Sequence, residues 1–434
     1  MYNDIINLLN LEQFHITFQS IETIQKDYVI YCYLKLERTV SSCAVCGGTE
    51  LSVHDYQNKK IKHSISTKKP CFLIYKARRY RCKYCNHIFY ENNPFALKYE
   101  QHSSYTIFSV LDALKIHTET FTNVARTFKL TKMQVLRIFD QYVQCVRQPL
   151  SKVICFDEVY TSKSYNHKYA FVMVDFLTSH ILDVYSSRHM YRLSQNLSMI
   201  PDKERNNVSF IVIDMWDTYK RLAKLYFKHA IIAVDSFHVI FHLNRAITNI
   251  RLKVMRKYDK RTSTLQANSM YYYMLKKFHY FFTRNYENIY DKPIYIKKLR
   301  ASWNKDEIRK YLLHIDPSLK EAYYLKEQYR EFNFSAQYET CDAEFSDLRL
   351  KFLNSDLEEF REFGKLISRW QENIKNSFIR VEGRRLSNGP IEGVNSRIKT
   401  IMRNANGYKS FERLRNRIMY SINKDMPFLG TPNK

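Results

Sequence analysis

The sequence is poor in glycine, proline and acidic residues. Its 434 residues include 8 Gly and 9 Pro, together with 34 Tyr and 28 Phe, a composition typical of an AT-rich genome. There is no low-complexity tract and no internal repeat, and hydrophobic residues make up 45% of the chain. This hydrophobic content fits a globular protein and excludes a largely disordered one. At roughly 150 residues per domain, the length predicts about three domains.

Long apolar runs and an export signal are also missing. No apolar run approaches the roughly 18 residues of a membrane-spanning helix, so we expect no membrane span. The segment Met1–Asn10 lacks the basic region and the small-residue cleavage site of a signal peptide. We therefore expect a soluble protein of the cytoplasm.

The shortage of acids leaves the chain strongly cationic. Against 69 Lys or Arg stand 43 Asp or Glu, which gives a formal net charge of +26. Nucleic acid is the expected partner, because neutralising its phosphates releases counterions and drives binding. The alternative is that codon bias alone has enriched the chain in lysine. The distribution of the charge along the chain separates these two interpretations.

Four of the nine cysteines form two close pairs. Cys43 and Cys46 make one C-x2-C pair, and Cys82 and Cys85 make the other. Without an export signal, metal binding is the expected use of such pairs, and two of them complete a tetrahedral Zn²⁺ site. Gly47 can supply the positive φ that the first pair needs. The sequence predicts one Zn²⁺ in an amino-terminal module; the alternative is four unligated, buried thiols.

The stretch between the two cysteine pairs predicts a strand hairpin with a basic surface. Strands are expected at Leu51–Tyr56 and Cys71–Tyr80, so that a hairpin brings the pairs together. The basic residues of this stretch are Lys59, Lys60, Lys62, Lys68, Lys69, Lys76, Arg78, Arg79, Arg81 and Lys83. A zinc-stabilised module with such a surface is typical of nucleic-acid binding.

A helix-turn-helix is predicted within Phe121–Ile138. Residues 103–147 have a helical period, and Thr131 is placed to cap the second helix. The side chains expected to enter the major groove are Lys132, Gln134 and Arg137. Lys129 occupies the turn position where glycine is usual. The alternative is an ordinary helical hairpin.

Apolar runs after Pro149 predict a buried central sheet. Strands are expected at Lys152–Phe156, Lys168–Phe176, His180–Ser186, Val208–Ile213 and Ala230–Val234. Near-continuous apolar runs indicate strands that are covered on both faces. Three strands at hairpin spacing, followed by strand, helix and strand, give the order of a ribonuclease-H-like sheet.

Acidic residues end these strands. Asp157 and Asp214 come at the carboxyl ends of strands, where α/β sheets place active sites. Glu392 follows Pro390 in the first turn of a later helix and supplies a third acid. Each acid alone has a structural explanation, as a turn former or as a partner of the helix dipole. Together they predict a site for Mg²⁺ or Mn²⁺, which prefer oxygen ligands. Two such ions can serve an in-line phosphoryl transfer.

The chain resembles the ISL-three family of bacterial insertion-sequence transposases. The resemblance rests on the cysteine pairs, the helix-turn-helix and four motifs in order: FDE (156–158), VIDMW (212–216), DSFH (235–238) and SNGPIEGVNSRIKTIMRNANGY (387–408). It implies a DDE recombinase with Asp157, Asp214 and Glu392 as catalytic residues and ligands of two Mg²⁺ ions. It further implies cleavage at terminal inverted repeats of double-stranded DNA and joining of the 3′ ends to target DNA. Asp235 and His238 match a further motif and are expected to have a supporting role, as is Asn395.

The predicted fold class is multidomain α+β. The expected parts are a zinc module at 1–98, a helix-turn-helix at 99–149, a ribonuclease-H-like core at 150–240, an all-helical insertion at 241–375 and the core's last helices at 376–434. A basic, aromatic-rich stretch at 245–300 is expected to hold DNA; packed amphipathic helices are the alternative. Because two element ends must be brought together, a homodimer on DNA is expected.

Two other functions remain open from the sequence. One is a regulator, or a decayed element protein, that binds repeats without cleaving them; the other is a metal-dependent nuclease that does not join strands. The charge distribution favours nucleic acid in each case. Arginines and lysines surround Glu392, and those expected to contact DNA are Arg397, Lys399 and Arg403. Codon bias explains a high lysine content, but it does not explain an arginine-rich cluster around a candidate metal ligand. A cationic protein of this kind is expected with the nucleoid.

Overall fold

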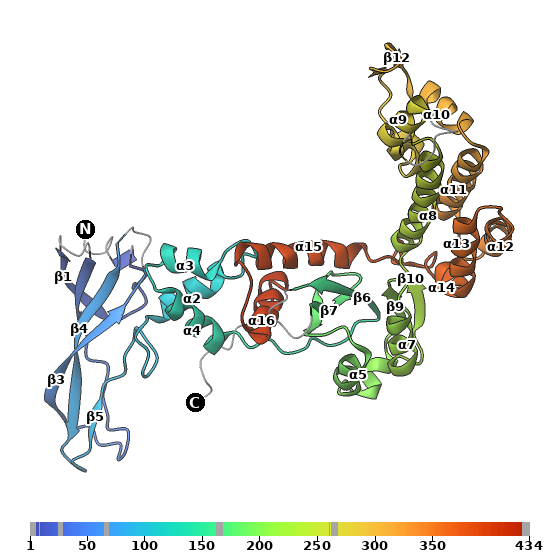
Figure 1. Cartoon of the computed structure of the whole chain (residues 1–434). Helices are drawn as coiled ribbons and strands as arrows, with labels where there is room; N and C mark the ends of the chain where they lie inside the picture. Colours follow the sequence, from blue (N-terminus) through green and yellow to red (C-terminus); the bar gives the residue numbers. More distant parts are fainter. Residues whose placement is uncertain are drawn as a thin grey trace. The chain divides into compact units, whose positions relative to one another are not determined.

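The computed structural model shows a mixed α+β fold (Figure 1). It describes residues 6–7, 9–24, 29–64, 69–161, 168–259, 261 and 268–427. The chain forms two compact units. The first comprises Met1–Arg147, Val159–Tyr169 and Val394–Lys434, and the second comprises Gln148–Glu158 and Ala170–Gly393. In these described ranges, no helix is both long and apolar enough to cross a membrane.

The first unit begins with a five-stranded sheet. Its strands are β1 (Ile16–Ile24), β2 (Val29–Leu36), β3 (Leu51–Lys62), β4 (Cys71–Cys82) and β5 (Ile88–Tyr90), in the order β1-β2-β4-β3 with β5 on β4. The antiparallel pair β3–β4 aligns Leu51 with Cys82, so the predicted hairpin is confirmed. Alternate side chains of β4, including Leu73 and Tyr75, are buried, as expected for a sheet with one face on a core.

Three short helices follow this sheet: α2 (Ser104–Ala113), α3 (Phe121–Thr127) and α4 (Lys132–Tyr142). The predicted cap at Thr131 is present, because its side chain accepts from the Gln134 amide while the Gln134 side chain returns to the Thr131 amide. Lys129, between α3 and α4, has φ 54°. Glycine adopts this left-handed conformation at lower cost than lysine does. The turn expected between the two helices is nevertheless formed with Lys129 in the glycine position.

The last helix of the chain, α16 (Phe411–Ile422), belongs to the same unit. Its Arg417 is fully buried and donates to the carbonyl oxygens of Leu114, Ile116 and Glu119, the latter two at 2.9 and 2.8 Å. Tyr420 adds a bond to the carbonyl of Leu111 at 3.1 Å. The buried guanidinium of α16 therefore binds the backbone of the segment that connects α2 and α3, although the two are far apart in the sequence.

The second unit is built on another five-stranded sheet. Its strands are β6 (Val153–Tyr160), β7 (Tyr169–Asp175), β8 (Ile181–Tyr185), β9 (Phe210–Ile213) and β10 (Ile231–Val234), in the order β10-β9-β6-β7-β8. β9 is parallel to both β6 and β10, whereas β7 and β8 are antiparallel. The strand residues are almost all buried, so the predicted central sheet is confirmed. The helices α5 (Met190–Ser198), α6 (Asp202–Asn206) and α7 (Asp217–Tyr226) connect β8, β9 and β10.

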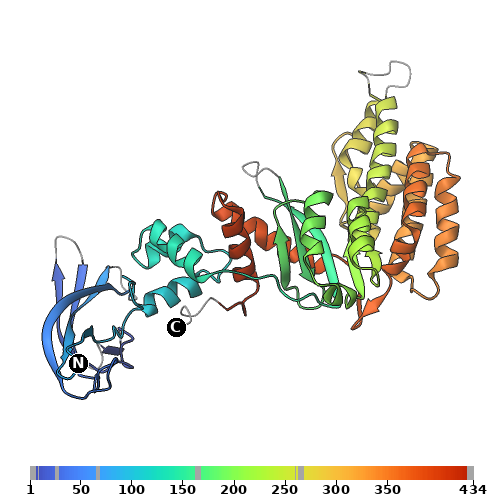
Figure 2. The ribbon, with the colours of Figure 1, turned by 90° about the horizontal axis from the view of Figure 1, so that it is seen from below.

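A mainly helical segment follows β10. Its helices are α8 (Ser236–Lys257), α9 (Ser269–Lys277), η1 (His279–Phe282), η2 (Tyr286–Asn288), α10 (Lys305–His314), α11 (Pro317–Ser335), α12 (Cys341–Leu353), α13 (Glu358–Arg369) and α14 (Gln371–Asn376). Helices α8, α11 and α13 lie side by side (Figure 2). Aromatic residues fill the space between them, for example Tyr329 of α11 against Phe363 of α13. These rings form a packed core.

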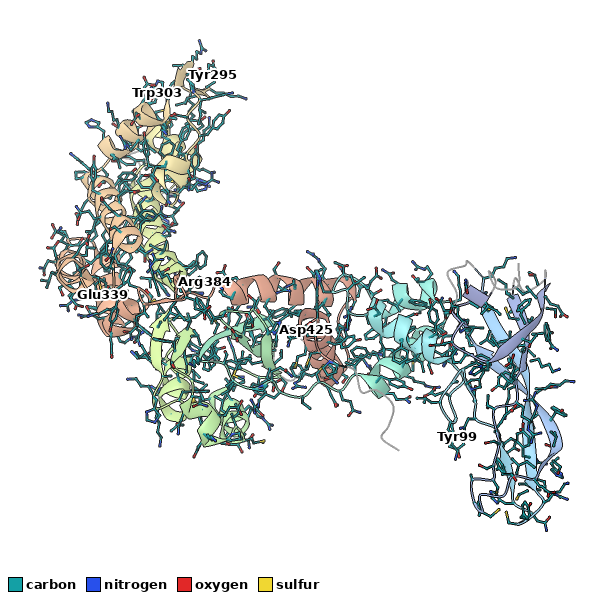
Figure 3. The ribbon with its side chains drawn as sticks, turned by 180° about the vertical axis from the view of Figure 1, so that it is seen from behind. Tyr99, Tyr295, Trp303, Glu339, Arg384 and Asp425 are labelled. Atoms are coloured by element: carbon teal, nitrogen blue, oxygen red, sulfur yellow. The ribbon has the colours of Figure 1, made fainter. Side chains whose placement is uncertain are left out.

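The prediction of an all-helical insertion was wrong in one respect. The strands β11 (Ile294–Ile296) and β12 (Ala301–Trp303) form a short antiparallel hairpin, on which Tyr295 and Trp303 are labelled in Figure 3. Its strands are rich in β-branched and aromatic residues, and Arg300, at φ 51°, allows the turn. A second hairpin, β13 (Arg380–Val381) with β14 (Arg384–Arg385), precedes the long helix α15 (Gly389–Asn404).

We predict that Arg417→Met lowers the free energy of unfolding of the first unit by about 3 kcal/mol, because three buried carbonyl groups lose their donor. Urea denaturation followed by circular dichroism measures this loss. The matched control, Lys424→Met, removes an exposed cation and should change stability by less than about 0.5 kcal/mol. Equal stability of the two variants would contradict a role for the buried guanidinium.

Candidate metal and catalytic sites

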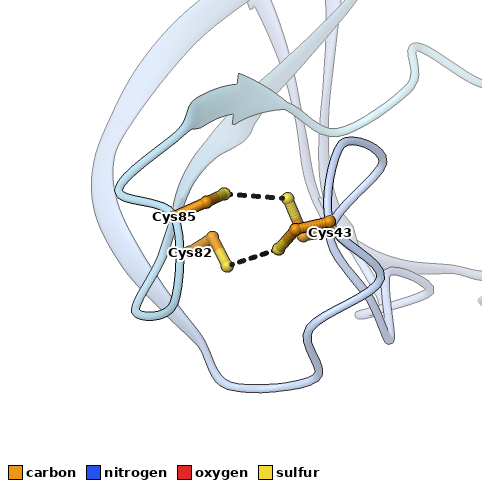
Figure 4. A group of neighbouring side chains, drawn as sticks. Cys43, Cys82 and Cys85 are labelled. Atoms are coloured by element: carbon orange, nitrogen blue, oxygen red, sulfur yellow. Dashed lines mark hydrogen bonds between the residues drawn. The ribbon is translucent and has the colours of Figure 1, made fainter.

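The four paired cysteines come together at one end of the first sheet. Cys43 Sγ lies 3.7 Å from Cys85 Sγ, and Cys46 Sγ lies 3.5 Å from Cys82 Sγ (Figure 4). All four sulfur atoms lie within 4.8 Å of one another. Ligands about 2.3 Å from a tetrahedral Zn²⁺ are about 3.8 Å apart, so the four thiols fit one zinc ion.

The two cysteine turns have the same backbone design. The Gly47 amide donates to the Cys43 carbonyl at 2.9 Å, and the Asn86 amide donates to the Cys82 carbonyl at 3.0 Å. Gly47 and Asn86 both have positive φ, of 71° and 55°. Glycine and asparagine are the residues that accept this conformation most readily. The glycine had indicated the first turn in the sequence, whereas the matching asparagine of the second turn had been missed.

Backbone amides prepare the thiols for a cation. Hydrogen bonds from the amides of Cys46 and Val45 lower the pKa of the Cys43 thiol to about 7. Hydrogen bonds from the Cys85 and Tyr84 amides also lower the pKa of Cys82. Because the thiolate is the form that binds metal, these amides favour metal binding by Cys43 and Cys82. At Cys46 a hydrogen bond from the Gly48 amide is outweighed by the neighbouring Cys85 and Cys82 thiols, which raise its pKa to about 12.

Acidic side chains gather at one edge of the second sheet. Asp214 and Asp235 directly follow β9 and β10, as predicted. Asp157 lies inside β6, which continues to Tyr160, so the expectation that this strand ends before Asp157 was wrong. Val159 and Tyr160 are still part of β6, whose neighbours in the sheet are β9 and β7. Asp157 nevertheless lies level with the end of β9, because parallel β6 and β9 pair Cys155 with Val212, and so the three aspartates meet at the same edge.

The tightest group at this edge consists of Asp214, Asp235 and His238. One ligand atom from each lies within 4.8 Å of the other two. His238, in the first turn of α8, places Nε2 2.9 Å from Asp214 Oδ1. Asp235 is buried, and its Oδ2 has no hydrogen-bond partner among the described residues. An orphaned carboxylate oxygen beside a second carboxylate suits a cation.

Burial and mutual repulsion shift the pKa values of these acids. Burial, followed by the charge of Asp214, raises the pKa of Asp157 to about 7. Burial also raises the pKa of Asp235, against a hydrogen bond from the Asn388 amide. Burial opposes protonation of His238, but its hydrogen bond to Asp214 and the charge of that carboxylate give a net rise in pKa. The ionised forms of Asp157 and Asp235 are therefore disfavoured at this edge, whereas the protonated form of His238 is favoured.

Asn388 connects the three strand ends. Its side-chain Nδ2 donates to Asp214 Oδ1 at 2.8 Å and to the Phe156 carbonyl at 3.4 Å, and its amide donates to Asp235 Oδ1 at 3.3 Å. Its side chain is almost completely buried. From the sequence, no contact with the acids had been predicted for Asn388, which was noted only within the motif at 387–408. Its place four residues before Glu392 was the available signal for a role at the acids.

A second carboxylate lies next to Asp157 and is firmly held. Glu158 accepts from the Tyr219 hydroxyl at 2.7 Å and forms an ion pair with Arg188. The Arg188 guanidinium also lies 5.2 Å from the centre of the Trp216 ring. Glu158 is thus neutralised within the protein.

Glu392 lies in the first turn of α15, as predicted, and is exposed. Among the described residues it is not part of the group around Asp214. Asn395 is buried, whereas Lys399 and Arg403 are exposed and Arg397 is half-buried; all four belong to the first unit. On α4, Lys132 and Arg137 are exposed, but the Gln134 side chain is engaged in the cap of its own helix.

Comparison with known families gives this site its context. Residues 154–418 match the ISL3 family of DDE enzymes, described as transposase. The chain belongs to the ISL3 transposase family. Residues 39–85 match the zinc finger of the transposases IS204/IS1001/IS1096/IS1165, and this range contains all four clustered cysteines. No curated protein matches the chain. The resemblance seen in the sequence is therefore confirmed, and DNA is the partner that this enzyme family implies.

We predict that Cys82→Ser abolishes zinc binding by this transposase, because three remaining thiols hold the ion less tightly than four. Metal analysis should find one zinc per chain in the wild type and close to none in the variant. Cys341→Ser, which removes a buried thiol from the second unit, should retain the full zinc content. Equal zinc content in Cys82→Ser and wild type would contradict the assignment.

We also predict that the zinc-loaded protein without Mg²⁺ loses stability as pH rises from about 4 to about 7. The pKa of Asp157 is about 7 in the folded chain, and about 3.9 is usual for an unfolded one, so folding takes up a proton in this window. The raised pKa of His238 acts in the same direction, because its favourable charge is lost at higher pH. Asp157→Asn should therefore stabilise the second unit by about 2–4 kcal/mol at pH 8.

Calorimetry at pH 5 and pH 8 measures this difference. Asp347→Asn, which changes an exposed acid of α12, serves as the control and should leave the pH dependence unchanged. If Asp157→Asn is no more stable than the wild type at pH 8, ionisation of the Asp157 carboxyl does not destabilise the folded second unit.

Proposed function

We propose that this transposase binds the terminal inverted repeats of its element, hydrolyses a phosphodiester at each end and joins the 3′ ends to target DNA. The observation that carries the proposal is the group of Asp214, Asp235 and His238 at the ends of β9 and β10, together with Asp157 of β6, whose pKa the charge of Asp214 helps to raise. The strand order β10-β9-β6-β7-β8, with two parallel strands added beside β6, supports a ribonuclease-H-like core. The family match covers this whole region.

The donor set fits Mg²⁺ or Mn²⁺. Asp157 and Asp214 repel one another, and the Asp235 oxygen without a partner offers a further hard ligand. We propose Asp157, Asp214 and Glu392 as ligands of two ions. When bound, such ions activate the attacking water or 3′-hydroxyl and stabilise the leaving oxygen.

The protein's own groups set the geometry of these acids. His238 and Asn388 both bind Oδ1 of Asp214 and fix that carboxylate. Asn388 also ties β6 to β10, so Asp157 and Asp235 cannot move apart independently. Burial, followed by the charge of Asp214, raises the pKa of Asp157, so this carboxyl can hold a proton that a bound cation would replace.

The first unit supplies the proposed recognition of the element ends. We propose that Cys43, Cys46, Cys82 and Cys85 hold Zn²⁺, and that α3 and α4 form a helix-turn-helix. The exposed Lys132 and Arg137 are the side chains offered to the major groove, whereas Gln134 is committed to its cap. We further propose that Arg397, Lys399 and Arg403 bind DNA phosphates, that Asn395 supports α15, and that the active species is a homodimer.

We also propose the domain boundaries 1–98, 99–149, 150–240, 241–375 and 376–434. Support comes from the first sheet and β5 within 1–98, from helices α2 to α4 within 99–149 and from the second sheet within 150–240. Helix α8 begins at Ser236 and runs through the boundary at 240, so the core and the insertion share one continuous element.

A cleavage and joining assay tests the proposed function. The substrate is a labelled duplex that carries the inverted repeat flanking the gene, supplied with Mg²⁺ or Mn²⁺ and a target plasmid. Asp157→Asn, Asp214→Asn and Glu392→Gln should each slow cleavage by at least about 100-fold, because metal ligands matter at least as much as the residues that orient them. Asp347→Asn should cleave at the wild-type rate.

The outcomes separate the alternatives. Binding without cleavage at any metal concentration identifies a regulator or decayed element protein. Cleavage without insertion into the plasmid identifies a nuclease. Full cleavage by Asp157→Asn shows that the carboxylates at this edge do not hold the catalytic metal.

A further inference from the structure

Helix α8 carries an exposed row of side chains that begins beside the acids. The row repeats every four residues, and each member is exposed. We call it the α8 row; its members are Phe237, Phe241, Arg245, Asn249, Lys253 and Lys257. Residues four apart lie on the same side of a helix, about 6 Å from one another along its axis. The two members nearest the acids are aromatic.

The two phenylalanines do not contribute to the core of this unit. The exposed fraction is 60% for Phe237 and 52% for Phe241. The opposite side of α8, with Leu243, Ile247 and Ile250, packs into the core and accounts for the helix's stability. Two neighbouring exposed phenyl rings on one helix indicate a surface that binds something.

The rings lie next to the reacting groups. Phe237 stands between Asp235 and His238 in the chain, and its ring centre is 5.7 Å from that of His238. The same His238 contacts Asp214 at 2.9 Å. A ligand that covers the Phe237 ring therefore reaches the edge where the acids gather.

Two of the three cations in the α8 row are held in ion pairs. Lys253 is paired with Glu358 and Glu359, and Lys257 is paired with Asp316. Arg245 has no ion pair within the described ranges of the chain. The unpaired charge of the row thus lies one turn beyond Phe241, about 6 Å along the helix. Phe237 and Phe241 can each stack on a base, and Arg245 can bind a phosphate next to those bases.

We propose that Phe237, Phe241 and Arg245 form a platform for an unpaired stretch of the DNA strand that is cleaved. This inference rests on the proposed function and adds that the enzyme holds its substrate locally melted beside the acids. Each phenyl ring stacks on a base, and Arg245 binds a neighbouring phosphate. Single-stranded DNA is held in this manner by alternating stacking and charge contacts, with little dependence on sequence.

Unpaired DNA fits the row better than a duplex does. Bases in a duplex are spaced about 3.4 Å apart and stack on one another, so no base face is free for a ring. The spacing of about 6 Å between Phe237 and Phe241 along α8 suits bases that have come apart. A protein partner would also cover the rings, but it would not require a lone arginine in register with them.

Binding of fluorescein-labelled oligo(dT) by the full-length, zinc-loaded protein without Mg²⁺ tests the platform. The double variant Phe237→Ala with Phe241→Ala should bind the single strand about tenfold more weakly and leave the affinity for a 20-base-pair duplex unchanged. The slope of log affinity against log salt should not change, because stacking neutralises no phosphate. Arg245→Ala should reduce that slope by about 0.7.

The controls keep the test specific. Phe334→Ala removes a phenylalanine that is 92% exposed on α11 and should bind oligo(dT) as the wild type does. Replacing Phe237 and Phe241 with Trp should restore affinity. An unchanged affinity of the double alanine variant, or a loss that equals its loss for duplex, overturns the platform.

A further outcome identifies a different occupant. If the double alanine variant elutes as a smaller species on size-exclusion chromatography while its oligo(dT) affinity is unchanged, the rings join two copies of the chain and the platform is wrong. The binding assay measures no cleavage. Failure of the platform therefore leaves the cleavage assay with Asp157→Asn as an independent test of the proposed function.

Discussion

Repulsion between carboxylates at the carboxyl edge of β6, β9 and β10 is the constraint around which the second unit is arranged. β9 and β10 end directly before Asp214 and Asp235, and Asp157 lies within β6, level with the end of β9. The protein neutralises Glu158 with Arg188 and Tyr219, whereas the pKa of Asp157 stays well above its usual range. Asn388 and His238 hold Asp214 in place, and the charge of protonated His238 offsets part of the charge of the group. The strain is retained in the folded chain and is relieved when a cation binds.

Asn388 shows how the core is assembled from distant parts of the sequence. It comes 153 residues after Asp235, yet its amide and side chain join the ends of β6, β9 and β10. The helical segment from α8 to α14 must therefore fold back on itself before the site is complete. Asn373 and Asn376 of α14 make that return specific, because both side chains donate to the Ile232 carbonyl of β10 at 3.0 Å.

Sequence patterns predicted the elements better than their connections. Apolar runs located β7, β8, β9 and β10 because strands buried on both faces need continuous hydrophobic residues. The C-x2-C spacing located the cysteine cluster because two thiols of one turn face the same ion. The apolar runs predicted the succession of strands along the chain, but they gave no indication that β6 continues past Asp157. Extension of a strand is decided by pairing with its neighbour, which local composition does not contain.

The roles of polar residues were harder to predict for a related reason. Asn388 carries no charge, and its value depends on three partners that are remote in the chain. Conversely, Gln134 looked like a reader of DNA bases, but its nearest hydrogen-bond partners are on its own helix. A capping box gives acceptors to backbone amides that would otherwise lack them. The Gln134 side chain therefore bonds to its own helix end and does not extend away from it.

Net charge, finally, is modulated by ion pairs and by cation–π contacts, and both kinds of contact occur in each unit. In the second unit, for example, Lys253 forms an ion pair with Glu358, and Lys257 forms one with Asp316. In the first unit, Lys60 lies over the rings of Tyr31 and Phe72, which keeps its charge available at the sheet surface. A cation over an aromatic ring is held in place without being neutralised, whereas an ion pair removes its charge from the field. The capacity to attract DNA is therefore set by how the lysines and arginines are paired, and the formal charge of +26 is its upper limit.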